Sequence, residues 1–181
     1  METKAICVYG ASSSRIDPKY IEAGRRVGEL IARAGRTLVC GGGSTGMMAA
    51  AIDGAVAEGG RTVGIIPAFM EKKGWAHAQL SETIVTHDMH VRKETMLRLS
   101  TAAIALPGGV GTLEELLECA TWIQLGLYGG RLVILNVDGY YDPLLEMLKR
   151  AADENFMRDD QTLYEVASTP EEAVAKAIAN D

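Results

Sequence analysis

Residues 102–115 read AAIALPGGVGTLEE, and this stretch passes from an apolar run through a glycine-rich turn into a helical pattern. The run 102–106 has the length and composition of a strand that is buried on both faces. The run breaks at Pro107, and three of the next four residues are glycines, which let backbone N–H groups approach a ligand without interference from Cβ atoms. A helix is predicted from Thr112, and its N-terminus would attract an anion. The stretch therefore predicts a strand–turn–helix unit in which Glu115 lies near an anion site.

The same alternation of strand and helix runs along the whole chain. Strands are predicted at 4–9, 37–40, 61–66, 82–85, 102–106, 132–136 and 163–166. Helices are predicted at 18–34, 45–58, 89–101, 112–124, 143–154 and 170–179, and 68–81 is predicted to be a loop. Short apolar strands between helices predict parallel βαβ units. We expect one α/β domain over residues 1–181, a Rossmann-like doubly wound sheet with helices on both faces and ligands beyond the carboxyl ends of its strands.

Composition limits the classes of function. The chain has 181 residues, 48% of them hydrophobic, and a formal net charge of −6. This length and apolar content suit one substantial core, and the negative charge argues against nucleic acid, which a basic face would attract. The N-terminus leads directly into a predicted strand, and no apolar run is long enough to span a bilayer. We therefore expect a cytoplasmic protein without a membrane or nucleic-acid partner.

Cysteine and histidine spacing gives no metal site. Cys7, Cys40 and Cys119 are odd in number and far apart, with no CxxC pair, so reduced buried thiols are expected. His87 and His90 lie near a helix start, but neither HExxH nor a thiolate cluster accompanies them. The nucleophile elbow GxSxG is also absent. We expect neither a metal nor a serine-hydrolase triad.

The first glycine loop follows the predicted strand 37–40. Gly41-x-Gly43-x-x-Gly46 fits the dinucleotide fingerprint in form, but that fingerprint needs an acidic residue about 20 positions later, where the next strand ends. Here the next strand ends at Ile66, before Pro67, without a carboxylate. A nicotinamide or flavin dinucleotide is therefore not expected. The glycines either serve another ligand or only form a tight, closely packed turn.

The second glycine loop lacks the Gly-Lys-Ser/Thr of a Walker A motif, so triphosphate chemistry is not supported. Its residues allow two interpretations. Thr112 and Glu115 fit the Thr-x-x-Glu capping box, in which both side chains serve only to start a helix. Capping does not explain why Gly108, Gly109 and Gly111 stand together, and a docked ligand would explain it.

A basic helix is predicted just before the strand 102–106. By spacing, one stripe of this helix holds Met89, Arg92, Met96 and Leu99. Arg92 on a mainly apolar face needs an anionic partner, either a ligand or a carboxylate such as Glu115; otherwise its charge reaches out to water. Solvent-facing positions are predicted for Lys93, Glu94 and Arg98.

Two motifs at this spacing resemble the LONELY GUY family. They are Met89-His90-x-Arg92-Lys93 and Pro107-Gly108-Gly109-x-Gly111-Thr112-x-x-Glu115. The resemblance runs nearly end to end, and it includes Val8-Tyr9-Gly10-Ala11-Ser12-Ser13, Gly41-Gly42-Gly43, Ala76-His77, Thr121-Trp122-x-Gln124-Leu125-Gly126 and Leu135-Asn136-Val137-Asp138-Gly139-Tyr140-Tyr141. Members of this family are cytokinin riboside 5′-monophosphate phosphoribohydrolases, often labelled lysine decarboxylases, and they are usually homodimers.

The resemblance implies hydrolysis of the N-glycosidic bond of an adenosine-type 5′-monophosphate, as in an AMP nucleosidase, which releases the base and ribose 5-phosphate. It implies no metal and no cofactor. Arg92 and Glu115 would be the catalytic pair. The substrate site would be lined by Ser12, Gly42, Gly43, Lys93, Gly108, Gly109, Val110, Gly111, Thr112, Leu113, Glu114 and Thr121.

Two positions depart from the family pattern. Gly74 stands where many relatives carry a glutamate, and Val91 stands where many carry Glu or Gln. Both departures bear on base recognition rather than on the glycosidic chemistry. A different hypothesis uses the same glycine loops without chemistry at Glu115, in a non-catalytic carrier of a nucleotide or of molybdenum cofactor. Amino-acid decarboxylation would need a cofactor-bearing lysine in a pocket, and the lysines are scattered.

Overall fold

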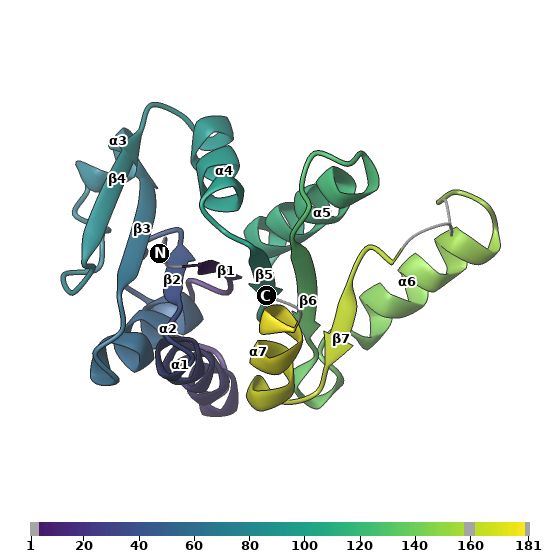
Figure 1. The fold of residues 1–181 in the computed structure, drawn as a ribbon, viewed down its shortest axis with the longest axis horizontal. Coiled ribbons are helices and arrows are strands. Elements are labelled where there is room, and N and C mark those ends of the chain that lie inside the picture. Colours follow the sequence, from purple (N-terminus) through teal and green to yellow (C-terminus); the bar gives the residue numbers. More distant parts are fainter. Residues whose placement is uncertain (1–3, 158–161, 180–181) are drawn as a thin grey trace.

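A computed structural model of the chain describes residues 4–157 and 162–179 and shows one parallel sheet (Figure 1). Its strands are β1 (Ala5–Tyr9), β2 (Thr37–Cys40), β3 (Thr62–Pro67), β4 (Glu82–Thr86), β5 (Ala102–Ala105), β6 (Arg131–Leu135) and β7 (Glu165–Ala167). Their order across the sheet is β4-β3-β2-β1-β5-β6-β7, and every pair in this order is parallel. The sheet grows outward from β1 in both directions, which confirms the prediction of a doubly wound, Rossmann-like α/β fold.

Helices connect the strands. They are α1 (Pro18–Arg33), α2 (Gly46–Ala57), α3 (Ala68–Glu71), α4 (Met89–Arg98), α5 (Val110–Gln124), α6 (Asp142–Asp153) and α7 (Pro170–Ile178), with a 3₁₀ turn at Val137–Gly139. The sequence sets the ends of α1 locally. Asp17 caps it by accepting from the N–H of Lys19, Pro18 occupies its first turn, and Gly35 follows it with a φ of +67°.

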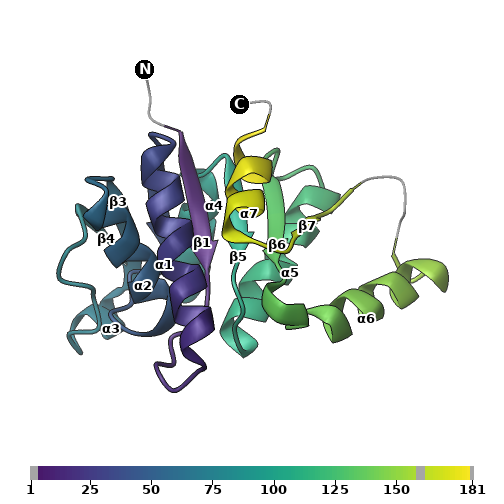
Figure 2. The ribbon, with the colours of Figure 1, turned by 90° about the horizontal axis from the view of Figure 1, so that it is seen from below.

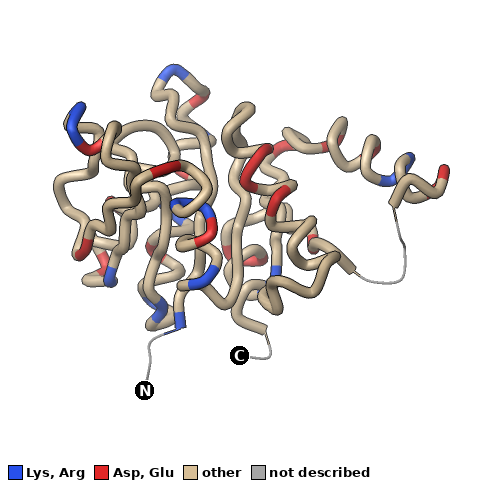
Figure 3. Tube along the Cα trace, turned by 90° about the horizontal axis from the view of Figure 1, so that it is seen from above, with Lys and Arg blue, Asp and Glu red and all other residues tan. Residues whose placement is uncertain are grey.

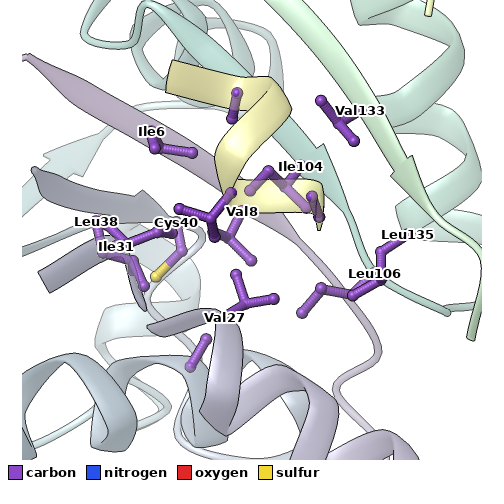
Figure 4. Packing of buried hydrophobic residues seen from close by; sticks show 14 of the residues in the cluster. Ile6, Val8, Val27, Ile31, Leu38, Cys40, Ile104, Leu106, Val133 and Leu135 are labelled. Atoms are coloured by element: carbon purple, nitrogen blue, oxygen red, sulfur yellow. The ribbon is translucent and has the colours of Figure 1, made fainter. Parts of the chain in front are cut away.

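Two apolar cores lie on opposite faces of the sheet, because side chains alternate along each strand. Helices α1, α2 and α7 cover one face, where Val27 shares a buried cluster with Val8 and Ile104 (Figure 4). Helices α4 and α5 cover the other, where Met96 and Leu116 share a second cluster with the alternate strand residues. The central strands are therefore buried on both sides, as their unbroken apolar runs predict.

The outer parts of the molecule are less packed. Helix α6 contains no fully buried residue: Leu144 and Leu145 near its start pack against the second core, and the rest of the helix extends outward (Figure 2). Acidic and basic residues are interspersed along the chain (Figure 3). The three cysteines are buried and free, as predicted. Within the described residues, no helix combines the length and apolar character that a bilayer span requires. The single domain over 1–181 stays a prediction, and 1–3, 158–161 and 180–181 lie outside the described residues.

Some predicted boundaries are wrong. Helix α5 begins at Val110 and not at Thr112, because the carbonyl of Gly109 already accepts a helical bond from the N–H of Leu113 at 3.0 Å. Helix α4 ends at Arg98, before the predicted residue 101, and the predicted loop 68–81 contains the short helix α3. These ends depend on neighbouring segments, so local pattern alone sets them poorly.

Candidate active site

A cavity of about 680 Å³ opens at the carboxyl ends of the central strands. The turn after β1, the glycine loops after β2 and β5, the segment after β3, and the first turns of α4 and α5 line it. Two backbone bonds join these loops: the N–H of Ala11 donates to the carbonyl of Pro107 (3.1 Å), and the carbonyl of Ala11 accepts from the N–H of Met47 (2.8 Å). The cavity lies beside the point where the strand order reverses between β1 and β5, the place where doubly wound sheets bind ligands.

Arg92 and Glu115 form a buried ion pair in this cavity. The Nη1 of Arg92 lies 3.2 Å from Oε1 of Glu115, and their side chains are only 8% and 12% exposed. The Nε of Arg92 also donates to the carbonyl of Ile65 at 3.0 Å, which fixes the plane of the guanidinium. Of the two hypotheses for Arg92, the structure selects the carboxylate partner, and the charge does not reach out to water.

The first glycine loop provides the space for that guanidinium. A Cβ on Gly41 would lie 1.9 Å from Nη2 of Arg92, well inside van der Waals contact. Arg92 therefore occupies the volume that a side chain at position 41 would need. Gly41 is therefore needed to make room for the Arg92 side chain, a reason that neither the dinucleotide fingerprint nor a tight turn supplies.

Burial dominates the electrostatics of Glu115. It raises the pKa of this carboxyl from 4.5 to about 7, although the guanidinium of Arg92 lowers the pKa and the ammonium of Lys93 lowers it as well. The neighbouring Glu114 raises it further. A carboxyl with a pKa near 7 can take up and release a proton at neutral pH, which suits general acid–base chemistry.

The N-terminus of α5 carries no side-chain cap. Its N-cap residue is Gly109, no side chain accepts from its first N–H groups, and no acidic residue occupies its first turn. Thr112 lies inside the helix and Glu115 binds Arg92, so the capping-box interpretation is wrong. The first N–H groups of α5 have no acceptor within the helix, and Val110 at this end of the helix lines the cavity. Free N–H groups at the positive end of a helix dipole form an arrangement that binds anions.

The glycines of the second loop have different reasons to be glycine. A Cβ on Gly108 would lie 2.1 Å from Oγ1 of Thr112, so packing requires this glycine. A Cβ on Gly109 or on Gly111 would meet no protein atom within 4 Å, and both residues line the cavity. Packing does not explain these two glycines, whereas room for a ligand does.

The structure brings most of the predicted site residues together. The cavity is lined by Ser12, Gly43, Arg92, Gly109, Val110, Gly111, Thr112, Glu114 and Glu115. Five other predicted site residues lie in the described part of the chain but are not among the residues that line the cavity. They are Gly42, Lys93, Gly108, Leu113 and Thr121. Leu113 packs against the second core, and the hydroxyl of Thr121 donates to the carbonyl of Leu117 at 2.7 Å. Contacts of these five residues with a nucleotide stay predictions.

Two predictions for the basic helix are wrong. Lys93 does not face solvent: its side chain is 7% exposed and its ammonium binds the carboxylates of Glu114 and Glu118 on α5. Leu99, predicted on the inner stripe, follows the end of α4 and is 44% exposed. The helical pattern shows which residues share a face, but it does not show that α5 brings two carboxylates to Lys93.

The cavity also has an apolar part that the sequence pattern did not predict. Its residues are Met48, Ile66, Met70, Trp75 and Met89. The position of Ile66 at the end of β3 was a usable signal, since ligands lie beyond strand ends. The segment that carries Met70 and Trp75 was linked to base recognition only through the family resemblance at Gly74 and Ala76-His77. Its own pattern predicts a loop, and it reaches the cavity by pairing Ala76 with Gly43 in an isolated bridge.

Comparison with known proteins identifies relatives in sequence. A protein-family model described as possible lysine decarboxylase matches residues 48–177. A cytokinin riboside 5′-monophosphate phosphoribohydrolase of Arabidopsis thaliana is 45% identical over 155 residues, which are 85% of this chain and 71% of that protein. A probable enzyme of the same name from Oryza sativa subsp. japonica is 40% identical over 175 residues, 96% of this chain and 71% of that protein.

Solved structures share the fold at lower identity. The molybdenum cofactor binding protein of the phototrophic bacterium Rippkaea orientalis has a TM-score of 0.76 and 26% identity, covering 97% of this chain and 96% of that one. The molybdenum cofactor carrier protein of Chlamydomonas reinhardtii has a TM-score of 0.70 and 23% identity, covering 96% and 95%, and shows the fold alone. The sequence matches, in contrast, reach 45% and 40% identity over 85% and 96% of this chain, and the family model's match over residues 48–177 includes the positions of Arg92 and Glu115. The chain belongs to the LONELY GUY family, the family of the cytokinin riboside 5′-monophosphate phosphoribohydrolases.

Proposed function

We propose that this protein hydrolyses the N-glycosidic bond of adenosine-type nucleoside 5′-monophosphates, including cytokinin riboside 5′-monophosphates, to give the free base and ribose 5-phosphate. The buried pair of Arg92 and Glu115, set beside the uncapped N-terminus of α5, is the observation that carries the proposal. Relatives that are 40% and 45% identical are named for this reaction. The same cavity offers an anion site, an ionisable acid and an apolar wall within one volume.

Each part of the cavity suits one part of such a substrate. The N–H groups at Val110 and Gly111 would bind the 5′-phosphate, because they have no helical acceptor and the helix dipole favours an anion. The ribose would lie over Glu115. The base would lie against the apolar wall formed by Met70, Trp75 and Met89.

The chemistry then follows from the ionised carboxyl. The C1′–N bond breaks with its electron pair going to the base, and the ribose takes on oxocarbenium character that the Glu115 carboxylate stabilises. The oxygen of a water molecule bonds to C1′. Glu115 takes one hydrogen of that water as a proton, and this proton is finally transferred to the departing base, where it neutralises the negative charge. The other hydrogen stays on the oxygen as the new hydroxyl group. Arg92 holds the carboxylate in place and favours its ionised form.

The cavity does not suit a pyridoxal-dependent decarboxylase. That reaction needs a lysine amine to form a Schiff base with the cofactor. Among the described residues, no lysine lines the cavity, and the nearby Lys93 is held by two carboxylates. The hydrolase therefore fits the residues better than the reaction in the family model's description.

Product analysis tests the proposal directly. Purified protein is incubated with AMP, with N6-isopentenyladenosine 5′-monophosphate and with both nucleosides lacking the phosphate, and free base is measured by chromatography. We expect release from the monophosphates and little from the nucleosides. Glu115→Gln and Arg92→Ala should abolish release, whereas Glu94→Gln, which alters a surface pair with Arg98 on the same helix, should not. Tight binding without turnover, unaffected by Glu115→Gln, would instead indicate a carrier.

We further propose that the chain acts as a cytoplasmic homodimer. Leu125 and Leu127, at the end of α5 and just after it, are each 65% exposed, and a partner would cover them. The three free, buried thiols are compatible with a reducing compartment. Light scattering should give twice the chain mass, and the Leu125→Glu, Leu127→Glu double variant should give the chain mass.

A further inference from the structure

Consecutive residues of α4 pair with residues of α5 across the gap between the two helices. Arg92 binds Glu115 at 3.2 Å, and the next residue, Lys93, binds Glu118 at 2.7 Å and also binds Glu114. The Lys93 ammonium therefore links two successive turns of α5. These ion pairs connect α4, the helix that carries the arginine, with α5, the helix that carries the acid.

The contacts of Lys93 leave it poorly placed to bind substrate. Its side chain is 7% exposed, and two of its three N–H donors point to carboxylates. Glu114 and Glu115 both line the cavity, whereas Lys93 is not among the lining residues. A buried ammonium is stable only when it is paired, and removing Lys93 would leave the carboxylate charges of Glu114 and Glu118 that its ammonium now balances.

We propose that Lys93 is a positioning residue that neutralises Glu114, so that the adjacent Glu115 can ionise and stay beside Arg92, and that Lys93 does not contact the substrate. This inference rests on the proposed function for its effect on rate, and on the Lys93–Glu114–Glu118 contacts for its effect on Glu115.

The electrostatics around Glu115 agree with this role. The pKa of Glu115 is raised mainly by burial and further by Glu114, while Arg92 and Lys93 lower it. Without Lys93, its ammonium would no longer lower the pKa of Glu115, and the half-exposed carboxylate of Glu114 would lose its paired cation. Both changes raise the pKa of Glu115.

Other groups near Glu115 do not supply a compensating charge. From β1 and β2, the ionisable groups that interact with it are Cys7, Tyr9 and Cys40. Burial raises the pKa of each of these thiols and of the phenol, so all three are neutral at neutral pH. The positive charge near Glu115 therefore comes from α4.

A rescue experiment tests the role of Lys93. In Lys93→Met we expect kcat at pH 6.5 to fall roughly 3- to 10-fold, the acid limb of the kcat profile to move to higher pH, and KM for AMP to stay within about twofold. Adding Glu114→Gln should return the acid limb and recover most of kcat. Lys93→Arg should resemble the wild type. A rise in KM with an unchanged pH profile and no rescue would show that Lys93 is a substrate ligand and would overturn the proposal.

A measurement without substrate separates this inference from the proposed function. The carboxyl carbon of Glu115, followed by ¹³C NMR, should titrate at higher pH in Lys93→Met and return toward the wild-type midpoint in Lys93→Met, Glu114→Gln. Glu114→Gln alone keeps Lys93 paired with Glu118 and should lower the midpoint, so it tests the coupling even where Lys93→Met does not fold. Unchanged midpoints would refute the inference, whereas failure of the wild type to release base would refute only the proposed function.

Discussion

The glycine loops after β2 and β5 are alike in sequence and differ in what occupies the space beside their glycines. In the first loop, the Arg92 guanidinium fills the volume beside Gly41. In the second, Thr112 fills the volume beside Gly108, while Gly109 and Gly111 face open cavity. A glycine can thus be required by a functional side chain, by packing or by a ligand, and the motif alone does not say which.

Gly41→Ala should have the largest effect on this comparison. The new Cβ would lie 1.9 Å from Nη2 of Arg92, so the guanidinium must move away from Glu115. We expect kcat/KM to fall by roughly 10²- to 10³-fold, since small displacements of catalytic groups have effects of this size. Gly129→Ala is the matched control, because its Cβ would meet no protein atom within 4 Å and Gly129 is not among the residues that line the cavity. Equal losses in both variants would show that Gly41 does not act through Arg92.

The ion pair between Arg92 on α4 and Glu115 on α5 predicts the pH dependence. With a pKa of about 7 for Glu115, kcat should fall about tenfold for each pH unit below that value. Stability depends on pH in the opposite direction: kcat rises with pH, whereas the contribution of Glu115 to stability falls. The folded-state pKa lies above the unfolded value of 4.5, so the folded state binds more protons in between, and the Glu115 contribution to stability decreases as pH rises from 4.5 to about 7.

Urea unfolding of the wild type and of Glu115→Gln from pH 4.5 to 8 measures this effect on stability. The difference in unfolding free energy between them should shift in favour of Glu115→Gln as pH rises, because glutamine does not titrate. A difference independent of pH would mean that burial does not raise the pKa of Glu115.

Gly108→Ala tests the packing role within the second loop. Its Cβ would overlap the Oγ1 of Thr112 at 2.1 Å, and the carbonyl of Gly108 also accepts from the hydroxyl of Tyr140 at 2.8 Å. We expect a loss of about 1–3 kcal/mol in the free energy of unfolding, the usual effect of overpacking. Denaturant titration checks this. Unchanged stability would indicate that the loop relaxes easily and would weaken the contrast between its glycines.

Gly111→Ala should show the smallest effect on stability. Its Cβ would meet no protein atom within 4 Å, and alanine is favoured over glycine in a helix, so stability should be unchanged or higher by up to ~1 kcal/mol. The added methyl should nevertheless raise KM for AMP roughly 3- to 10-fold by narrowing the phosphate site. An unchanged KM would place the phosphate elsewhere.

The linear pattern contained most of the fold. Strands such as 37–40 and 102–105 are apolar without alternation, and that feature by itself implies a parallel sheet with two covered faces. Local signals also set the ends of α1, where Asp17, Pro18 and Gly35 act within a few residues of the boundary. The predicted start of α5 was wrong because Thr112 and Glu115 match the capping-box pattern. In the structure neither side chain caps the helix, and Gly109 is the N-cap residue.

The sequence by itself determined the order of strands and helices, the two glycine loops, and Arg92 and Glu115 as candidates for a functional pair. These features depend on short-range spacing, which the order of residues contains. Only the tertiary structure decided that the guanidinium fills the space beside Gly41 and that Lys93 is buried between Glu114 and Glu118. Those outcomes arise where segments far apart in the chain meet, and there burial and unlike charges, rather than local preference, determine where each side chain lies.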